Sequence, residues 1–194
     1  MPIAFDMIVI GTSLGGLSAL RAVLHTLPAN FPTPILIVRH LPANTDDYVI
    51  ETLSRDCLLT VQKATQGQAP QPGCVYIAPP DRHLQLDPAG CLQITDTEKV
   101  NFSRPAIDPL FFSAAQQYGR RLIAVLLTGA NADGAQGLLA VKQAGGTVII
   151  QDPKSAEADV MPLAGLALLQ PDHLVWLSQI GSLLWDLTRD TAHQ

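Results

Sequence analysis

Three residue types that cooperate in acyl transfer each follow an apolar run of this chain, at the point where the run ends. They are Ser13, His40 and Asp133. A serine hydroxyl is a poor nucleophile at neutral pH, but a neutral imidazole within hydrogen-bond reach can take its proton. A carboxylate on the other ring nitrogen fixes the tautomer and stabilises the imidazolium. The set therefore indicates nucleophilic catalysis, if the fold brings the three side chains together.

Glycines surround the serine in the segment Gly11-Thr12-Ser13-Leu14-Gly15-Gly16. Gly15 and Gly16 would let a substrate carbonyl approach backbone N–H groups at a helix N-terminus. Donors of this kind stabilise an oxyanion, and each is worth roughly 10²–10³ in rate. This turn is therefore a candidate for oxyanion and substrate binding.

Each of the three residues also has an ordinary structural interpretation. Ser13 would cap the first helix, His40 would be a strand-end histidine satisfied by backbone groups, and Asp133 would cap the helix that follows it. Taken singly, these interpretations stay open. We favour catalysis because all three residues stand at predicted strand ends.

The elements that must position these residues alternate along the chain. Apolar runs predict strands, and apolar residues at helical spacing predict helices between them. The expected strands are 7–10, 35–38, 58–62, 122–127 and 147–150, and the expected helices are 14–26, 44–57, 105–118, 134–144 and 172–187. This alternation predicts a single α/β domain over 1–194, a doubly wound, mostly parallel sheet with helices on both faces. Because the carboxyl ends of parallel strands share one edge, we expect the three residues at that edge.

The middle of the chain follows a different pattern. Short strand candidates at 74–78, 84–86 and 92–94 surround the turn Asp87-Pro88-Ala89-Gly90. No helical spacing separates them. The pattern predicts an antiparallel β-hairpin insertion in the parallel sheet.

Composition excludes several classes of protein. The 194 residues are 47% hydrophobic and 15% charged, with a formal net charge of −5, which argues for a large core and against a nucleic-acid partner. Three cysteines without a CxxC pair argue against a disulfide framework and a thiolate metal site. No signal peptide and no apolar stretch of membrane-spanning length are visible. We expect a cytoplasmic protein without membrane insertion.

The turn at Ser13 also approximates two other glycine patterns. Gly11-x-x-x-Gly15-Gly16 is similar to the nucleotide-binding GxGxxG, but Ser13 replaces the glycine that the pyrophosphate needs, and there is no Walker lysine. The GxSxG nucleophile elbow is approximated as well, but in the α/β-hydrolase fold the order is serine, acid, histidine. The order here is serine, histidine, acid. A nucleotide binder remains the weaker alternative.

Six ordered segments carry a resemblance to a known family. They are Ile8-Val9-Ile10-Gly11-Thr12-Ser13-Leu14-Gly15-Gly16, His40-Leu41-Pro42, Tyr76-Ile77-Ala78-Pro79-Pro80-Asp81-Arg82-His83-Leu84, Arg104-Pro105-Ala106-Ile107-Asp108, Leu127-Thr128-Gly129 and Asp133-Gly134. Over residues 6–185 the chain resembles the catalytic domain of the chemotaxis receptor methylesterase family (CheB-type protein-glutamate methylesterase). The resemblance implies a catalytic triad at Ser13, His40 and Asp133, and hydrolysis of γ-glutamyl methyl esters with release of methanol. It implies no metal and no cofactor, and related enzymes also deamidate receptor glutamines.

The same resemblance implies partners. The substrates would be methylated chemoreceptor-type proteins. Full-length regulators of the family carry an N-terminal receiver domain, which this sequence lacks. A phosphorylated receiver domain acting in trans, or a methyltransferase, would then be a further partner.

Four further residues are candidates at the site. Backbone N–H groups near Leu14 and Ala130 would hold the oxyanion, although the family typically has Thr and Met at these two positions. His83 would lie at the rim of the site, and Arg104 would contact the substrate or a neighbouring acid. The departures at Leu14 and Ala130 leave one alternative open, a degenerate, non-catalytic domain that docks on receptors or signalling partners.

Overall fold

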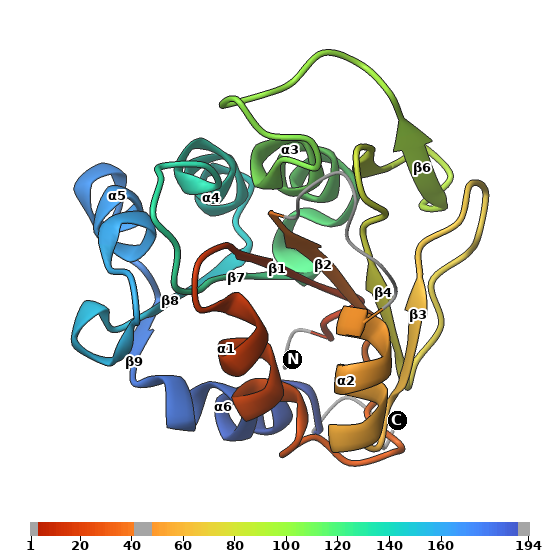
Figure 1. Ribbon diagram of the computed structural model, residues 1–194, viewed down its shortest axis with the longest axis horizontal. Helices are drawn as coiled ribbons and strands as arrows, with labels where there is room; N and C mark the ends of the chain where they lie inside the picture. Colours follow the sequence, from red (N-terminus) through yellow and green to blue (C-terminus); the bar gives the residue numbers. More distant parts are fainter. Residues whose placement is uncertain (1–3, 41–47, 190–194) are drawn as a thin grey trace.

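The chain folds around one parallel β-sheet, seen in Figure 1. The computed structural model describes residues 4–40 and 48–189. Within them the sheet has the order β3-β4-β2-β1-β7-β8-β9, and all neighbouring strands are parallel. Its strands are β1 (Met7–Thr12), β2 (Ile35–Arg39), β3 (Thr60–Lys63), β4 (Cys74–Ile77), β7 (Leu122–Leu126), β8 (Thr147–Gln151) and β9 (His173–Val175). A separate antiparallel pair comprises β5 (His83–Leu86) and β6 (Leu92–Thr95). The predicted fold class is therefore confirmed.

Helices cover both faces of the sheet, as Figure 1 shows. One face carries α1 (Gly16–Leu24), α2 (Tyr48–Asp56) and α6 (Leu177–Arg189), and the other carries α3 (Ile107–Tyr118), α4 (Ala135–Gln143) and α5 (Val160–Leu168). Successive residues of each strand point to opposite faces, so a strand covered on both sides must be apolar at every position. The central strand β1 is buried along its whole length. This is why the strands read as uninterrupted apolar runs in the sequence.

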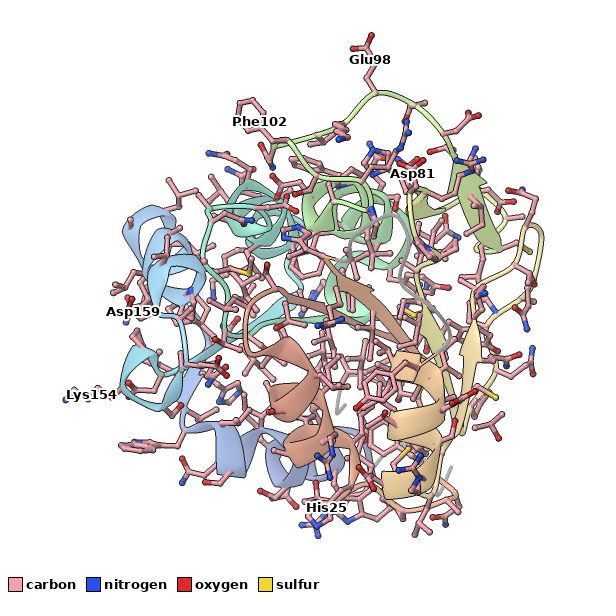
Figure 2. The ribbon with its side chains drawn as sticks, in the orientation of Figure 1. His25, Asp81, Glu98, Phe102, Lys154 and Asp159 are labelled. Atoms are coloured by element: carbon pink, nitrogen blue, oxygen red, sulfur yellow. The ribbon has the colours of Figure 1, made fainter. Side chains whose placement is uncertain are left out.

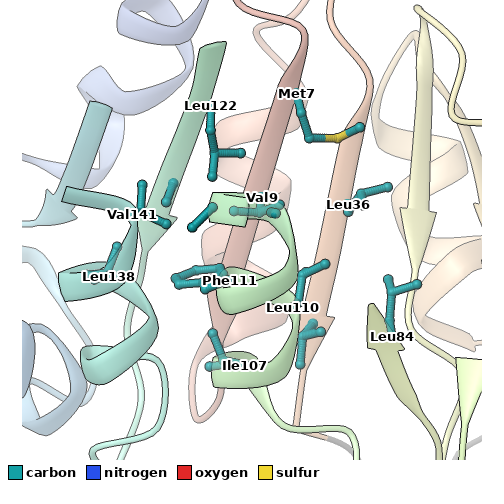
Figure 3. Close-up of a cluster of buried hydrophobic side chains, with 14 of the residues drawn as sticks. Met7, Val9, Leu36, Leu84, Ile107, Leu110, Phe111, Leu122, Leu138 and Val141 are labelled. Atoms are coloured by element: carbon teal, nitrogen blue, oxygen red, sulfur yellow. The ribbon is translucent and has the colours of Figure 1, made fainter. Parts of the chain in front are cut away.

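The α3 side of the core is shown in Figure 3. Leu110 and Phe111 of α3 pack over Val9 of β1 and Leu36 of β2, and Leu138 of α4 belongs to the same buried cluster. All of these side chains are fully buried. Close packing of this kind fixes α3 over the middle of the sheet, and its N-terminus therefore lies at a fixed place near the carboxyl ends of the strands.

The prediction for residues 74–78 was wrong in one respect. The strand β4 does not belong to the hairpin but pairs in parallel with β2 and β3, with Ile35 opposite Val75 and Lys63 opposite Ile77. A parallel connection usually contains a helix, whereas the segment between β3 and β4 contains none. The missing helical spacing is what made the segment look antiparallel. The hairpin itself consists of β5 and β6 only.

The prediction of one helix over 172–187 was also wrong. Residues His173–Val175 form the edge strand β9, which pairs with β8 through Ile149 opposite His173. The helix begins only at Leu177 and ends at Arg189. A three-residue edge strand is too short to show a period-2 pattern, so its residues were assigned to the helix whose spacing begins directly after it. The predicted helix start at residues 44–47 lies outside the described residues.

Candidate active site

The three predicted residues lie on neighbouring loops because of the strand order. The central strand β1 lies between β2 and β7, so the segments that leave these strands meet at one edge. The backbone N–H of Ser13 donates to the Thr128 carbonyl at 3.0 Å, and that of His40 donates to the Thr12 carbonyl at 3.2 Å. These main-chain hydrogen bonds join the turn that carries Ser13 to the segment after β7 and to His40, independently of the side chains.

Side chains of Ser13, His40 and Asp133 form a continuous hydrogen-bonded row. Oγ of Ser13 lies 3.1 Å from Nδ1 of His40, and Nε2 of His40 lies 2.7 Å from Oδ2 of Asp133. The side chain of His40 is 13% exposed and that of Asp133 is fully buried. The row thus runs from the half-buried Ser13, which is its reactive end and lies nearest to solvent, to the buried Asp133.

The row also assigns the tautomer of His40. An ionised carboxylate can only accept hydrogen bonds, so Nε2 carries the hydrogen that points at Asp133. Nδ1 then offers its lone pair to the hydroxyl of Ser13. An imidazole in this state can act as a general base toward the serine.

Asp133 is held by the N-terminus of α3. The backbone N–H groups of Ile107 and Asp108 donate to its two carboxylate oxygens at 2.6 and 3.2 Å. A carboxylate at this end of a helix is stabilised by free N–H groups and by the helix dipole. The structure thus answers one open alternative, because α4 begins after Gly134 with no side-chain cap, and Asp133 caps α3 instead. Ser13 likewise caps no helix, since the N-cap of α1 is Gly15.

A second carboxylate lies beside the first. Nδ2 of Asn101 donates to Oδ1 of Asp133 and to Oδ2 of Asp108, both at 2.8 Å. The backbone N–H of Gly137 donates to Oδ1 of Asp108 at 2.7 Å. Asp108 is only 4% exposed. Asn101 lies on the long loop between β6 and α3, and no local pattern in the sequence marks a loop residue that reaches the site.

The two carboxylates differ in their acidity. Burial alone would raise the pKa of Asp133, but the hydrogen bonds from His40, Ile107 and Asn101 together hold that pKa below its ordinary value. Burial raises the pKa of Asp108, and the negative charge of Asp133 raises it further. Asp133 is therefore ionised at neutral pH, and it carries the charge that faces His40.

The turn after Ser13 is shaped by its glycines and by one buried hydroxyl. Gly15 has a φ of 75°, in the left-handed region, and a Cβ there would lie 2.7 Å from Oε2 of Glu157. Oγ1 of Thr128 donates to the Leu14 carbonyl at 2.9 Å. The Leu14 side chain is 56% exposed. Within the described chain, the N–H groups of Leu14 and Ala130 donate no hydrogen bond, so both are available for a substrate oxygen.

His83 and Arg104 both make hydrogen bonds to other residues of the protein, and for Arg104 one partner is the neighbouring acid Asp81. His83 is 1% exposed, its Nε2 donates to the Glu98 carbonyl at 3.0 Å, and its Nδ1 accepts from the Ala106 N–H at 3.2 Å. No ring nitrogen is left for a ligand. The guanidinium of Arg104 donates to Asp81 and to two main-chain carbonyls of the same loop. Both residues fix the loop between β6 and α3, from which Glu98 and Phe102 project outward in Figure 2.

The part of the chain that the structure describes contains neither a candidate metal-binding cluster nor a membrane-spanning helix. Over these residues, no group of three or more His, Cys, Asp or Glu side chains is arranged to hold a metal ion. No helix among them is long and apolar enough to cross a bilayer.

Comparisons with known proteins show the family and the fold of this chain. The family model of the CheB methylesterase matches residues 8–184. A putative protein-glutamate methylesterase/protein-glutamine glutaminase from Leptospira interrogans is 39% identical over 190 residues, which are 98% of each chain. Protein-glutamate methylesterase/protein-glutamine glutaminase 2 from Anaeromyxobacter dehalogenans is 41% identical over 184 residues, 95% of this chain and 54% of that protein. The Thermotoga maritima CheB methylesterase catalytic domain superposes with a TM-score of 0.91 at 36% identity, covering 95% of this chain and 100% of the other.

Proposed function

This chain belongs to the CheB methylesterase family, and from that premise we propose that it hydrolyses γ-glutamyl methyl esters on chemoreceptor-type proteins. The products are a glutamate side chain and methanol. The observation that carries the proposal is the row from Ser13 Oγ through His40 to Asp133, at 3.1 and 2.7 Å. We assign Ser13 as nucleophile, His40 as general base and acid, and Asp133 as the residue that orients His40.

In the first half of the reaction, Ser13 Oγ bonds to the ester carbonyl carbon while Nδ1 of His40 takes the hydroxyl proton. The π electron pair of the carbonyl moves onto its oxygen, and the N–H groups of Leu14 and Ala130 donate hydrogen bonds to the resulting oxyanion. The intermediate then collapses and the carbon–methoxy bond breaks. His40 returns its proton to the methoxy oxygen, and methanol leaves an acyl-serine.

In the second half, water takes the place of methanol. His40 removes a proton from the water, the resulting hydroxide attacks the acyl-serine, and Ser13 leaves with the proton from His40. Throughout, Asp133 stabilises the imidazolium. With ammonia as the leaving group, the same steps would deamidate a glutamine side chain, which is the second activity in the names of the relatives.

Replacing the nucleophile tests this proposal directly. We expect Ser13→Ala to lower methanol release from methylated receptor membranes by several orders of magnitude, with an unchanged thermal unfolding midpoint. His40→Gln and Asp133→Ala should cause losses that do not add to that of Ser13→Ala, because the three residues act as one unit.

Labelling separates the enzyme from a non-catalytic docking domain. A serine-directed phosphonate should label the wild-type protein and leave Ser13→Ala unlabelled, and Ser182→Ala on exposed α6 serves as the matched control. A folded wild-type protein that neither reacts with the phosphonate nor releases methanol would contradict the esterase proposal and favour the docking domain.

A further inference from the structure

Asn131 places a side-chain amide at the reactive end of the triad. Its Nδ2 lies 3.1 Å from Nδ1 of His40, the same separation that Ser13 Oγ has from this nitrogen. Its Oδ1 accepts a hydrogen bond from the backbone N–H of Asp133 at 3.0 Å. Because an N–H donor occupies Oδ1, the amide is oriented with its NH₂ group toward His40.

The two contacts at Nδ1 compete in the resting state. A neutral imidazole nitrogen offers one lone pair, and the hydroxyl of Ser13 must point at that lone pair to be activated. Once the serine proton has moved to His40, Nδ1 is itself an N–H donor. The NH₂ group of Asn131 then faces another donor, and a donor without an acceptor in a half-buried site costs free energy. The amide therefore needs a new acceptor when the imidazolium forms.

One acceptor appears at that same step. As Ser13 Oγ bonds to the carbonyl carbon, the π electron pair of the substrate carbonyl moves onto its oxygen. In the mechanism proposed above, the backbone N–H groups of Leu14 and Ala130 bind this oxygen, and the hydrocarbon side chains of these two residues contribute no further donor. The Asn131 amide is a side-chain donor that contacts the same nitrogen of His40 as the Ser13 hydroxyl does.

We propose that Asn131 is a catalytic residue, whose Nδ2–H leaves Nδ1 of His40 and donates to the substrate oxyanion in both tetrahedral intermediates. This inference rests on the proposed esterase function. When each intermediate collapses, the electron pair returns to the carbonyl and the leaving oxygen takes the proton from Nδ1. The nitrogen regains its lone pair, and Asn131 returns to it.

Two substitutions separate this role from a structural one. Asn131→Ala removes both the donor and the acceptor, whereas Asn131→Asp keeps an oxygen for the Asp133 N–H, removes the donor and adds a negative charge beside Nδ1 of His40. We expect each variant to lose kcat by about 10²-fold, the value of one oxyanion donor, with KM changed less than about twofold. The rate of phosphonate labelling should fall by a similar factor, because the phosphoryl oxygen occupies the oxyanion position.

The matched control is Gln179→Ala on the exposed face of α6, because Oε1 of Gln179 also accepts a hydrogen bond from a backbone N–H, that of Trp176 at 3.2 Å. This variant should retain wild-type kcat and KM. If Asn131→Ala turns over as fast as the wild type or faster, Asn131 merely competes with Ser13 for Nδ1, and the inference is wrong. A loss confined to KM, or full activity of Asn131→Asp, would overturn it as well. Should Asn131→Ala fail to fold, Asn131→Asp decides. An inactive, unlabelled wild-type protein would instead be a failure of the proposed function.

Discussion

At the scale of single residues, the site depends on how two buried carboxylates share one small volume. Asp133 and Asp108 both accept a hydrogen from the amide of Asn101, at 2.8 Å each. Like charges this close repel each other strongly in a medium of low polarity. The NH₂ group of Asn101 places the positive end of the amide dipole between the two carboxylates and so reduces their repulsion. We infer that Asn101 positions Asp133 for its contact with His40.

Substitution of Asn101 tests this positioning role. Asn101 has a φ of 50°, so glycine removes the amide without adding backbone strain. We expect Asn101→Gly to lower kcat about tenfold or more at constant KM, since a hydrogen bond to a charged group is worth about 1.5–3 kcal/mol. Asn101→Asp should be worse at neutral pH and should recover part of its activity as the pH is lowered, because protonation removes the added charge. Equal kcat values for wild type and Asn101→Gly from pH 5 to 9 would refute the positioning role.

At the scale of elements, the packing of α3 against α4 determines the positions of Asp108 and Asp133. A Cβ at Gly137 of α4 would lie 2.5 Å from Cβ of Phe111 and 3.0 Å from Oδ1 of Asp108. The missing side chain lets the two helices approach until the Gly137 N–H reaches Asp108 at 2.7 Å. The helix contact and the hydrogen bonding of the site therefore depend on the same glycine.

Alanine substitutions measure this close approach. An exposed helical Gly→Ala change would stabilise by about 1 kcal/mol, but at Gly137 the new atom meets rigid atoms of α3. We expect Gly137→Ala to lower the free energy of unfolding by about 1–3 kcal/mol and to reduce kcat as well. The control is Gly165→Ala in α5, where the nearest atom is the flexible end of Ile150 at 3.0 Å, and a smaller loss is expected there. Urea unfolding checks both variants, and a Gly137→Ala protein as stable as the wild type would contradict the packing argument.

At the scale of the whole molecule, the fold brings remote parts of the chain to one edge of the sheet. Ser13 and His40 come from the first 40 residues and Asp133 from the loop after β7, and the pairing of β1 with both β2 and β7 makes them neighbours. The loop between β6 and α3 adds Asn101 from a third direction. A group whose pKa differs between the folded and unfolded states makes stability depend on pH, so the ionisation of these residues contributes to the free energy of unfolding.

The free energy of unfolding at acidic pH should depend on the ionisation of these carboxyl groups. The pKa of Asp133 is lowered, and so is that of Asp172, where the hydrogen bonds from Lys142 and the Val148 N–H outweigh burial. A carboxyl group with a lowered folded pKa contributes stability above its unfolded pKa of about 3.9 and loses that stability as the pH falls through the folded value. The pKa of Asp108 is raised, so this group opposes folding as the pH rises through its folded value.

We therefore expect the free energy of unfolding to fall as the pH drops below about 4. The fall should be shallower in Asp133→Asn, and Asp172→Asn tests the second group in the same way. Chemical denaturation from pH 3 to 7 measures the three profiles. Identical slopes for wild type and Asp133→Asn below pH 4 would show that the native contacts of Asp133 do not lower its pKa.

The sequence by itself determined the parallel sheet, its central strands and the three loops that carry Ser13, His40 and Asp133. These features follow from local spacing, because a strand buried on both faces must be apolar throughout and parallel strands end at a common edge. The strands β4 and β9 lacked such a local signal, so their partners were assigned only by the pairing of the folded sheet.

Only the tertiary structure decided which hydrogen bonds the residues of the site make. It placed His83 and Arg104 in the support of a loop, brought Asn101 and Asp108 behind Asp133, and turned the amide of Asn131 toward His40. Residues far apart in the chain make these contacts, and a side chain's hydrogen-bond partners depend on how the elements pack rather than on its own neighbours in sequence.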